Sequence, residues 1–144
     1  MRSIIGAQPE KANTVIITDM EAGIEHLSRS TPRHSEVMLI VTEPYYRSLE
    51  TAARIKTMSD ELGIPNVYVV ANKVRTENET EALQRFCVQR GLEIIATIPY
   101  DEMVAESSLV PAAPLDYCPD SAGVEAVVNL AKKLVLRNSS KNGR

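Results

Sequence analysis

The sequence of 144 residues has no tryptophan, one phenylalanine and two cysteines. So few aromatic residues mean that the core must be aliphatic. No apolar run reaches the ~18 residues that a membrane-spanning helix needs, and residues 1–13 lack the continuous apolar segment of a signal peptide. A net charge of −3 gives no broad attraction to nucleic acid or to anionic membranes. We therefore expect a cytoplasmic protein with no nucleic-acid partner and no membrane span.

Clusters of metal-binding or nucleophilic residues are also missing from the sequence. Cys87 and Cys118 lie far apart and form no CxxC pair, so we expect reduced thiols. His26 and His34 have no partner at metal-ligand spacing, which argues against a zinc site. The chain has no GxSxG motif, so a serine hydrolase of that type is excluded.

What the sequence does contain is short apolar runs rich in β-branched residues, which do not alternate with polar residues. Such runs suit strands that are covered on both faces, as in parallel sheets. Three of them are dense, and a fourth, at 93–98, is weaker. The dense runs cover residues 15–17, 37–41 and 67–71.

Helical patterns separate the later strands. The first covers residues 48–62, with Ser48 as its expected N-cap and Gly63 as its stop, and the second covers residues 77–90, stopped by Gly91. The spacing of the strands suits right-handed βαβ units. The order predicts an α/β fold with a mostly parallel sheet, flanking helices and three layers, of the Rossmann-like kind.

The last third of the chain has a different texture. Residues 109–119 hold three prolines, which predicts an irregular segment without helix. A final amphipathic helix is expected over residues 122–136. We treat residues 1–144 as one domain, with flexible ends at 1–13 and 137–144.

The stretch VIITDMEAGIEH, residues 15–26, carries the first polar signal. A strand that ends in Asp19 places a carboxylate at the rim of a ligand crevice, where such a group typically holds Mg²⁺, often through water. Gly23 lets the backbone approach a phosphate closely, and Glu21 or Glu25 would orient water. The alternative interpretation is that Asp19 caps a following helix.

Two further polar signals follow predicted strands. Asn72 and Lys73 close the run at 67–71, and an Asn side chain has the donor and acceptor that suit an adenine edge. Pro99 and Tyr100 offer a flat apolar surface to a base or a ribose, with Asp101 beside them. The alternatives are an ordinary strand-to-loop pair and a turn in which Asp101 caps a helix.

Taken in order, the motifs VIITDMEAGIEHLSRST, VTEP, SLETAARI, ELGI, VANKV and IPYDE resemble the MinD/ParA-like (SIMIBI) P-loop ATPases. The resemblance is strongest to their CooC-type members, which are accessory ATPases for nickel insertion into carbon monoxide dehydrogenase. It extends over about residues 14–135 and implies ATP or ADP with Mg²⁺ as cofactors. It also implies roles for individual residues. Asp19 would be the Mg²⁺ ligand, with Glu21 as a second catalytic acid, and the nucleotide would be bound by Gly23, Asn72, Lys73, Pro99, Tyr100 and Asp101.

The resemblance covers only the later half of the family domain. The sequence contains no GKT or GKS, so the family's phosphate-binding loop has no counterpart, and hydrolysis by this chain alone is not expected. In the family, the strand of that loop lies between the strand at 15–17 and the strand at 37–41. We therefore expect these two strands to rejoin directly, or a second copy to fill the space. Expected partners are a homodimer or a chain that supplies the missing half, and a metalloenzyme client.

Two other classes of protein remain open at this point. One is a non-catalytic interaction or regulatory module, which keeps the fold without productive nucleotide binding. The other is a different doubly wound domain, such as a receiver-like one, for which Asp19 and Lys73 are the only matching features.

Overall fold

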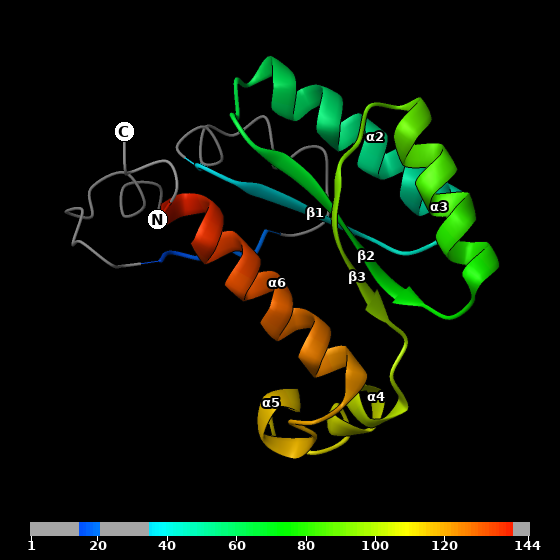
Figure 1. Cartoon of the computed structure of the whole chain (residues 1–144), viewed down its shortest axis with the longest axis vertical. Helices are drawn as coiled ribbons and strands as arrows, with labels where there is room; N and C mark the ends of the chain where they lie inside the picture. The colour runs from blue at the N-terminus through cyan, green and yellow to red at the C-terminus, as the bar shows by residue number, and fades with distance from the viewer. Residues whose placement is uncertain (1–14, 21–34, 140–144) are drawn as a thin grey trace.

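The computed structural model describes residues 15–20 and 35–139. Three parallel strands form its sheet in the order β1-β2-β3. They are β1 (Met38–Thr42), β2 (Val67–Val74) and β3 (Ile94–Pro99). A helix follows each of the first two strands, so the βαβ units predicted from the sequence are present (Figure 1). The α/β fold class with a parallel sheet and flanking helices is therefore confirmed.

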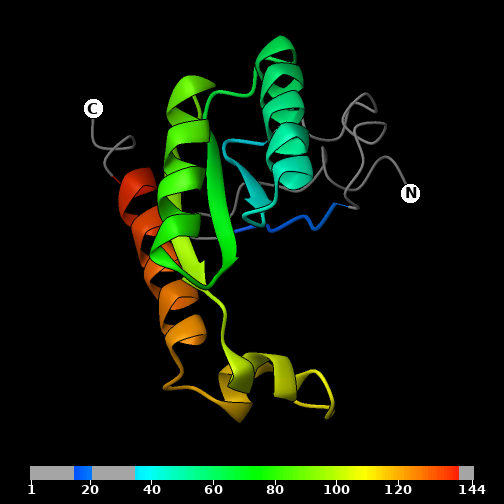
Figure 2. The same cartoon turned by 90° about the vertical axis from the view of Figure 1, so that its right-hand side faces the viewer.

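The helices lie on both faces of this sheet (Figures 1 and 2). Helices α2 (Tyr46–Glu61) and α3 (Glu77–Gln89) cover one face, and α6 (Ala122–Ser139) crosses the other. Two short helices, α4 (Glu102–Ser107) and α5 (Pro114–Tyr117), form a lobe beyond the carboxyl end of β3. None of the helices in the described part of the chain is long and apolar enough to cross a bilayer.

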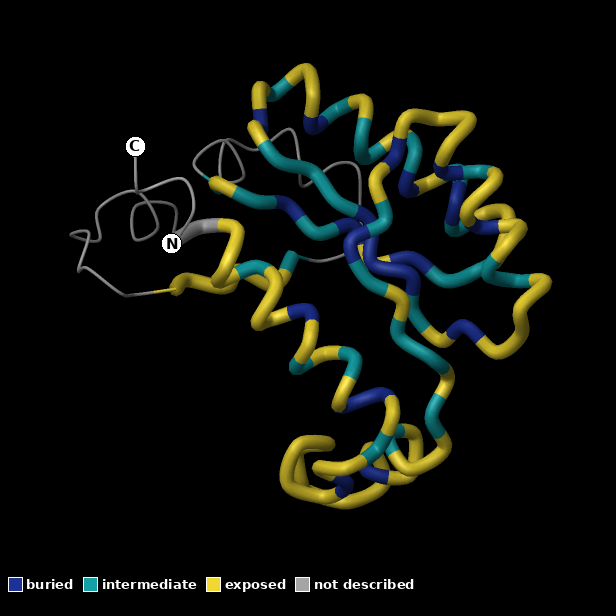
Figure 3. Tube along the Cα trace, viewed as in Figure 1, coloured by how far each residue is buried: buried dark blue, intermediate teal, exposed yellow. Residues whose placement is uncertain are grey.

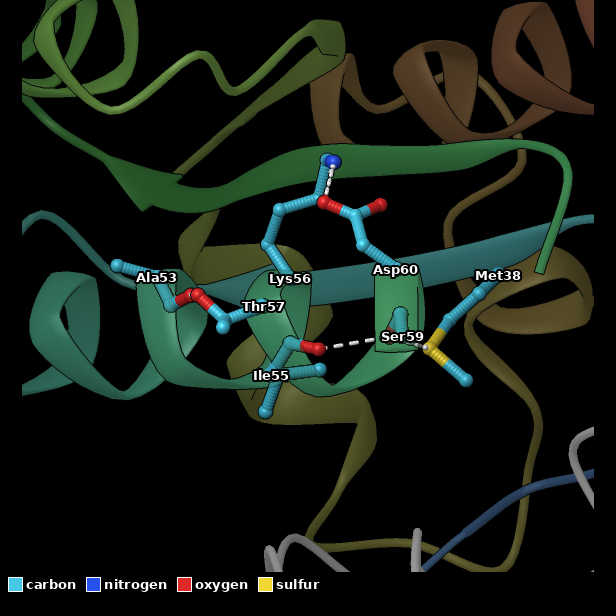
Figure 4. A network of polar contacts seen from close by, with 7 residues as sticks. All are labelled: Met38, Ala53, Ile55, Lys56, Thr57, Ser59 and Asp60. Carbon is cyan, nitrogen blue, oxygen red and sulfur yellow. Dashed lines mark hydrogen bonds and ion pairs between the residues drawn. The ribbon is translucent and has the colours of Figure 1, made fainter. Parts of the chain in front are cut away.

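The larger core lies between the sheet and the pair α2 and α3. Its buried members are aliphatic apart from Cys87, as the shortage of aromatic residues predicts. Ser59 is fully buried in α2, and its hydroxyl donates to the carbonyl of Ile55 at 2.7 Å and lies 3.0 Å from the sulfur of Met38 (Figure 4). This contact joins α2 to β1. The buried members are Met38, Ile40, Leu49, Ala52, Ile64, Val69, Ala71, Val74, Leu83, Cys87 and Leu92.

The smaller core lies beneath α6. Its buried residues are Val70 of β2, Ile95 of β3 and Leu130 of α6. The far end of α6 is held by Arg137, whose guanidinium lies 3.1 Å from the Glu93 carboxylate and stacks over the Tyr68 ring. The buried residues of α6 are Gly123, Val124 and Leu130, toward the lobe, and burial falls off toward Arg137, while most of the lobe itself is exposed (Figure 3).

The local stop and start signals read from the sequence are mostly confirmed. Gly63 and Gly91 have φ values of +73° and +64°, which favour glycine after a helix. Thr76 and Glu79 form a reciprocal capping box at the start of α3. The prediction for Ser48 is wrong, because α2 begins earlier and the Ser48 hydroxyl instead lies 2.8 Å from that of Thr42.

The predicted strand at 15–17 is also wrong. Residues 15–20 form no regular secondary structure, and Ile17 is 89% exposed. A strand of this composition gains stability only when neighbours cover its edges and faces, and the described residues provide no such neighbours here. The expectation that this strand rejoins the strand now seen as β1 is thus contradicted. Met20 alone packs against the larger core.

The proline-rich segment also contains a helix that the sequence argument excluded. Pro114 stands at the first position of α5, where its fixed φ suits a helix and its missing N–H costs no hydrogen bond. The prolines of this segment therefore do not exclude a helix, provided that they stand before it or at its first position.

Candidate functional site

The carboxyl ends of the three strands meet at one edge of the sheet, which is where ligands bind in open parallel sheets. Glu43 follows β1, and Lys73 stands near the end of β2. Their side chains form an ion pair with an N–O distance of 2.8 Å, and both are at least partly exposed. The pKa of Lys73 is raised, first by this hydrogen bond and then by the charge of Glu43. The pair therefore ties the first two strand ends together.

A second contact joins the ends of β2 and β3. The Arg75 guanidinium lies 4.1 Å from the centre of the Tyr100 ring, within the range of a cation–π contact. The Tyr100 N–H donates to the Val74 carbonyl at 2.9 Å. One face of the Tyr100 ring is therefore occupied by Arg75, and the segment after Pro99 is held close to the tip of β2.

Lys73 has a φ of +56°, and it is the only non-glycine residue with positive φ in the part of the chain that the structure describes. The backbone here is irregular, because three steps along β2, from Ala71 to Val74, match two steps along β3, from Thr97 to Pro99. The extra residue is a β-bulge. It moves Val74 into the larger core and leaves Lys73 exposed.

The carboxylate of Asp101 accepts hydrogen bonds from the protein's own backbone. Its Oδ1 accepts from the N–H groups of Met103 at 2.9 Å and Val104 at 3.3 Å, which caps α4. Its Oδ2 accepts from the Gly123 N–H at 2.8 Å, in the first turn of α6. The Gly123 bond is the main reason that the pKa of Asp101 is lowered, with Val104, Ser121 and Met103 contributing in the same direction. The alternative interpretation of Asp101 as a helix cap is thus confirmed.

Gly123 is the residue that allows this arrangement. A Cβ added there would lie 3.0 Å from the Cβ of Asp101 and 3.1 Å from a methyl carbon of Val104. Sequence reasoning missed Gly123 because its role depends on contact with a residue 22 positions earlier. A glycine in the first turn of a helix, two residues after a serine, was the only local signal.

The remaining predicted site residues are distributed unevenly. Asn72 is half-buried, and its side chain forms no hydrogen bond with another described residue. Asp19 is exposed and likewise has no polar partner among the described residues. Glu21, Gly23 and Glu25 lie outside the described ranges. The structure thus brings together Asn72, Lys73 and the segment 99–101, and the roles of all of them stay predictions.

These residues fit one side of a nucleotide better than the other. Asn72, Pro99 and Tyr100 offer amide and apolar surfaces of the kind that suits a base. For Mg²⁺, residues 15–20 and 35–139 offer Asp19 but contain no group of three or more acidic, histidine or cysteine residues that could hold a metal ion. Among the described residues, side chains of the kind that suits a base are present, whereas no cluster of three metal-ligating side chains is.

A hollow of about 510 Å³ lies elsewhere, along the outer edge of β3 next to α3. None of the predicted site residues lines it. Cys87, at its inner wall, has a pKa raised by burial, so this thiol is not activated. The lining residues are Gln84, Cys87, Val88, Leu92, Glu93, Ile94, Ile95, Ala96 and Thr97.

Comparison with known proteins finds related sequences, although no family model matches the chain. An ATP-binding protein of Methanocaldococcus jannaschii is 44% identical over 69% of this chain and 39% of its own length. A second ATP-binding protein of that organism is 38% identical over 83% of this chain and 48% of its own length. The carbon monoxide dehydrogenase accessory protein CooC of Rhodospirillum rubrum is 34% identical over 65% of this chain and 35% of its own length.

Solved structures support the same fold at lower identity. The MinD cell division protein of Aquifex aeolicus matches with a TM-score of 0.63 and 18% identity, over 73% of this chain and 46% of that protein. MinD of Pyrococcus horikoshii, solved in complex with Mg-ADP, matches with a TM-score of 0.59 and 22% identity, over 69% of this chain and 41% of that protein. The chain spans about half the length, or less, of the relatives that it matches here.

Proposed function

This chain belongs, as a partial chain, to the MinD/ParA-like ATPase family close to CooC, and we propose that it forms the base-binding half of a nucleotide site. In this proposal Asn72 reads the adenine edge and the segment from Pro99 to Tyr100 flanks the base. The observation that supports it is that Asn72, whose side-chain amide has no hydrogen-bond partner among the described residues, lies next to the Pro99–Tyr100 segment on adjoining strand ends.

The phosphate side of the site is proposed to come from another polypeptide segment. The sequence contains no GKT or GKS. Asp19 would then contribute a carboxylate to Mg²⁺, with Glu21 and Gly23 beside it. Hydrolysis requires the complete site, so we propose that this chain does not hydrolyse ATP by itself.

The biological role that we propose is the assembly of a metallocentre in the cytoplasm, with nickel as cargo and carbon monoxide dehydrogenase as the client. Its support is the 34% identity to CooC, whose name states its link to that enzyme. We expect this chain to co-sediment with nickel-free carbon monoxide dehydrogenase. Absence of binding in this assay would contradict the proposed role.

A second candidate is a non-catalytic interaction or regulatory module, and two observations favour it. The Asp101 carboxylate is filled by three backbone N–H groups, and Lys73 is paired with Glu43. These two side chains are therefore held by the protein itself.

Isothermal titration of the purified chain with Mg·ATP and Mg·ADP distinguishes the two candidates. The base-binding half predicts weak but measurable binding, and Asn72→Ala should weaken it at least about tenfold, as loss of a hydrogen-bonding pair to a base does. Gln89→Ala, at the end of α3, is the matched control and should change nothing. Absence of heat at millimolar nucleotide would leave the interaction module as the function of this chain.

A further inference from the structure

Strand β3 lies at one edge of the sheet, because among the described residues it pairs only with β2. The hollow of about 510 Å³ runs along this edge, and its lining includes Val88 of α3, which is 80% exposed. A strand edge beside exposed apolar side chains is a template for pairing with another chain, unless something blocks it. Two features of the β3 edge are of the kind that blocks such pairing.

The first feature is a lysine that bonds the backbone of β3. The Lys133 ammonium, on α6, donates to the Ile95 carbonyl at 2.9 Å. Ile95 is the extra residue of a β-bulge, since one step along β2, from Val69 to Val70, matches two steps along β3. The extra residue of a bulge is left unpaired in the ladder. The lysine therefore takes up a carbonyl that a neighbouring strand could otherwise use.

The second feature is a proline at the end of the strand. The Val69 N–H donates to the Glu93 carbonyl at 2.8 Å, so the amide of Ala71, two residues further along β2, also faces β3. Thr97 lies opposite Ala71, and its own N–H and C=O therefore face the open edge. Pro99, two residues later, has no N–H to donate. An added strand thus finds a donor at Thr97 but none at Pro99.

These features decide how a second copy of the chain could pair with the edge. A two-fold axis that sets Thr97 opposite Thr97 would place Ile95 opposite Pro99, which has no N–H to offer its carbonyl. A two-fold axis beside Ala96 sets Thr97 of each copy opposite Ile95 of the other. Each Thr97 N–H would then donate to an Ile95 carbonyl, which is the group that Lys133 already bonds.

We propose that Lys133 keeps the chain from pairing with a second copy through the edge of β3. Its ammonium occupies the carbonyl that the Thr97 N–H of a second copy would need. The joint would also bury two ammonium groups, and burial of a charge without an opposite partner is costly. The proline excludes the other register. The inference does not rest on the proposed function, because it concerns self-association and not nucleotide binding.

Sedimentation velocity of the full chain tests this proposal. Lys133→Met removes the ammonium and keeps an unbranched side chain, and it should dimerise with a dissociation constant at least about tenfold lower than that of the unaltered chain. Lys132→Met, at the neighbouring exposed lysine of α6, is the matched control for the lost charge and the added apolar surface. It should sediment like the unaltered chain. Lys133→Arg keeps a charged donor and should do the same.

Amide hydrogen exchange identifies the surface that pairs. In Lys133→Met the Thr97 amide should exchange at least about tenfold more slowly at high than at low protein concentration, because the dimer protects it. In the unaltered chain its rate should not vary with concentration. Val88→Lys, added to Lys133→Met, places a charge beside the edge and should restore the sedimentation of the unaltered chain.

Three results would overturn the proposal. The first is equal sedimentation of Lys133→Met and Lys132→Met. The second is a Lys133→Met dimer in which the Thr97 amide is unprotected, since the contact would then lie elsewhere. The third is a Thr97 amide that becomes protected with concentration in the unaltered chain, since the edge would then pair despite the lysine. Lys133→Ala with its control Lys132→Ala gives the same comparison in the best helix former, should Lys133→Met not fold.

Discussion

The two faces of the sheet differ in how completely they are covered. On one face, α2 and α3 bury eleven residues that include members of β1 and β2, with Ile94 of β3 partly buried against them. On the other, the smaller core beneath α6 has three buried residues, Leu39 of β1 is only partly buried against it, and Val41 is 62% exposed. The face under α2 and α3 is thus well packed, whereas the face under α6 is packed only in part. Among the described residues, the face under α2 and α3 is therefore the more completely covered of the two.

The largest expected effect tests this difference in the cores. Leu83→Ala, at a residue of α3 that is 2% exposed and faces the larger core, should lower the free energy of unfolding by about 2–5 kcal/mol. Leu130→Ala, at a residue of α6 that is 8% exposed and faces the smaller core, should cost less, about 2 kcal/mol, because water can fill part of the space. Urea unfolding of both variants measures the gap. Equal costs would mean that the two faces are equally well packed.

The junction of α6 with the lobe provides the second test. A glycine-to-alanine change inside a helix ordinarily stabilises by about 0.5–1 kcal/mol. At Gly123 the added Cβ crowds Asp101 and Val104, and overpacking of this kind costs about 1–3 kcal/mol. We therefore expect Gly123→Ala to lower the unfolding midpoint, measured by circular dichroism. A raised midpoint would show that the α6 side yields easily.

The start of α3, on the better packed face of the sheet, provides the third test. Thr76 accepts from the Glu79 N–H at 3.2 Å, and Thr76→Ala should cost about 1 kcal/mol. Thr57→Ala is the matched control in the interior of α2, where the hydroxyl only donates back to the Ala53 carbonyl (Figure 4). That variant should be neutral or slightly stabilising, since Ala is the better helix former. A loss in Thr57→Ala equal to that in Thr76→Ala would remove the cap as the cause.

The cap that Asp101 forms at the start of α4 gives the smallest effect, and this effect depends on pH. The pKa of Asp101 is lowered in the folded state, chiefly by the Gly123 N–H. Its contribution to stability is therefore complete above the unfolded pKa of about 3.9 and disappears as the pH falls through the lower folded pKa. Asp101→Asn should be less stable than the unaltered chain at pH 7, and the difference should shrink below about pH 4. A difference that does not vary with pH would contradict this assignment.

Much of the fold could be predicted from the sequence because its signals are local. β-branched runs, helical periodicity and the glycines at 63 and 91 define β1 to β3, α2 and α3 without reference to distant contacts. The run at 15–17 has the same composition and yet forms no strand, because a strand also needs neighbours, which composition does not encode. The helix α5 was missed because the prolines were counted without regard to their position at a helix start.

The candidate site was less predictable, for the same reason. The positions of Asn72 and Tyr100 at adjoining strand ends follow from the βαβ order. Asp101 accepts a hydrogen bond from Gly123, 22 positions away, and Lys73 forms an ion pair with Glu43, 30 positions away. No pattern within a single segment reveals such pairs.

The bulge at Lys73 decides which face of the sheet the side chains at the end of β2 lie on. Strict alternation from Ala71 through Lys73 would turn Val74 toward the side of α6, whereas the extra residue places Val74 in the aliphatic interior. Deletion of that one residue would restore a regular ladder and leave Val74 on its present side. Every side chain that follows, including Arg75 above Tyr100, would keep its side as well. The end of β2 can therefore lose this one residue without turning Val74 out of the interior.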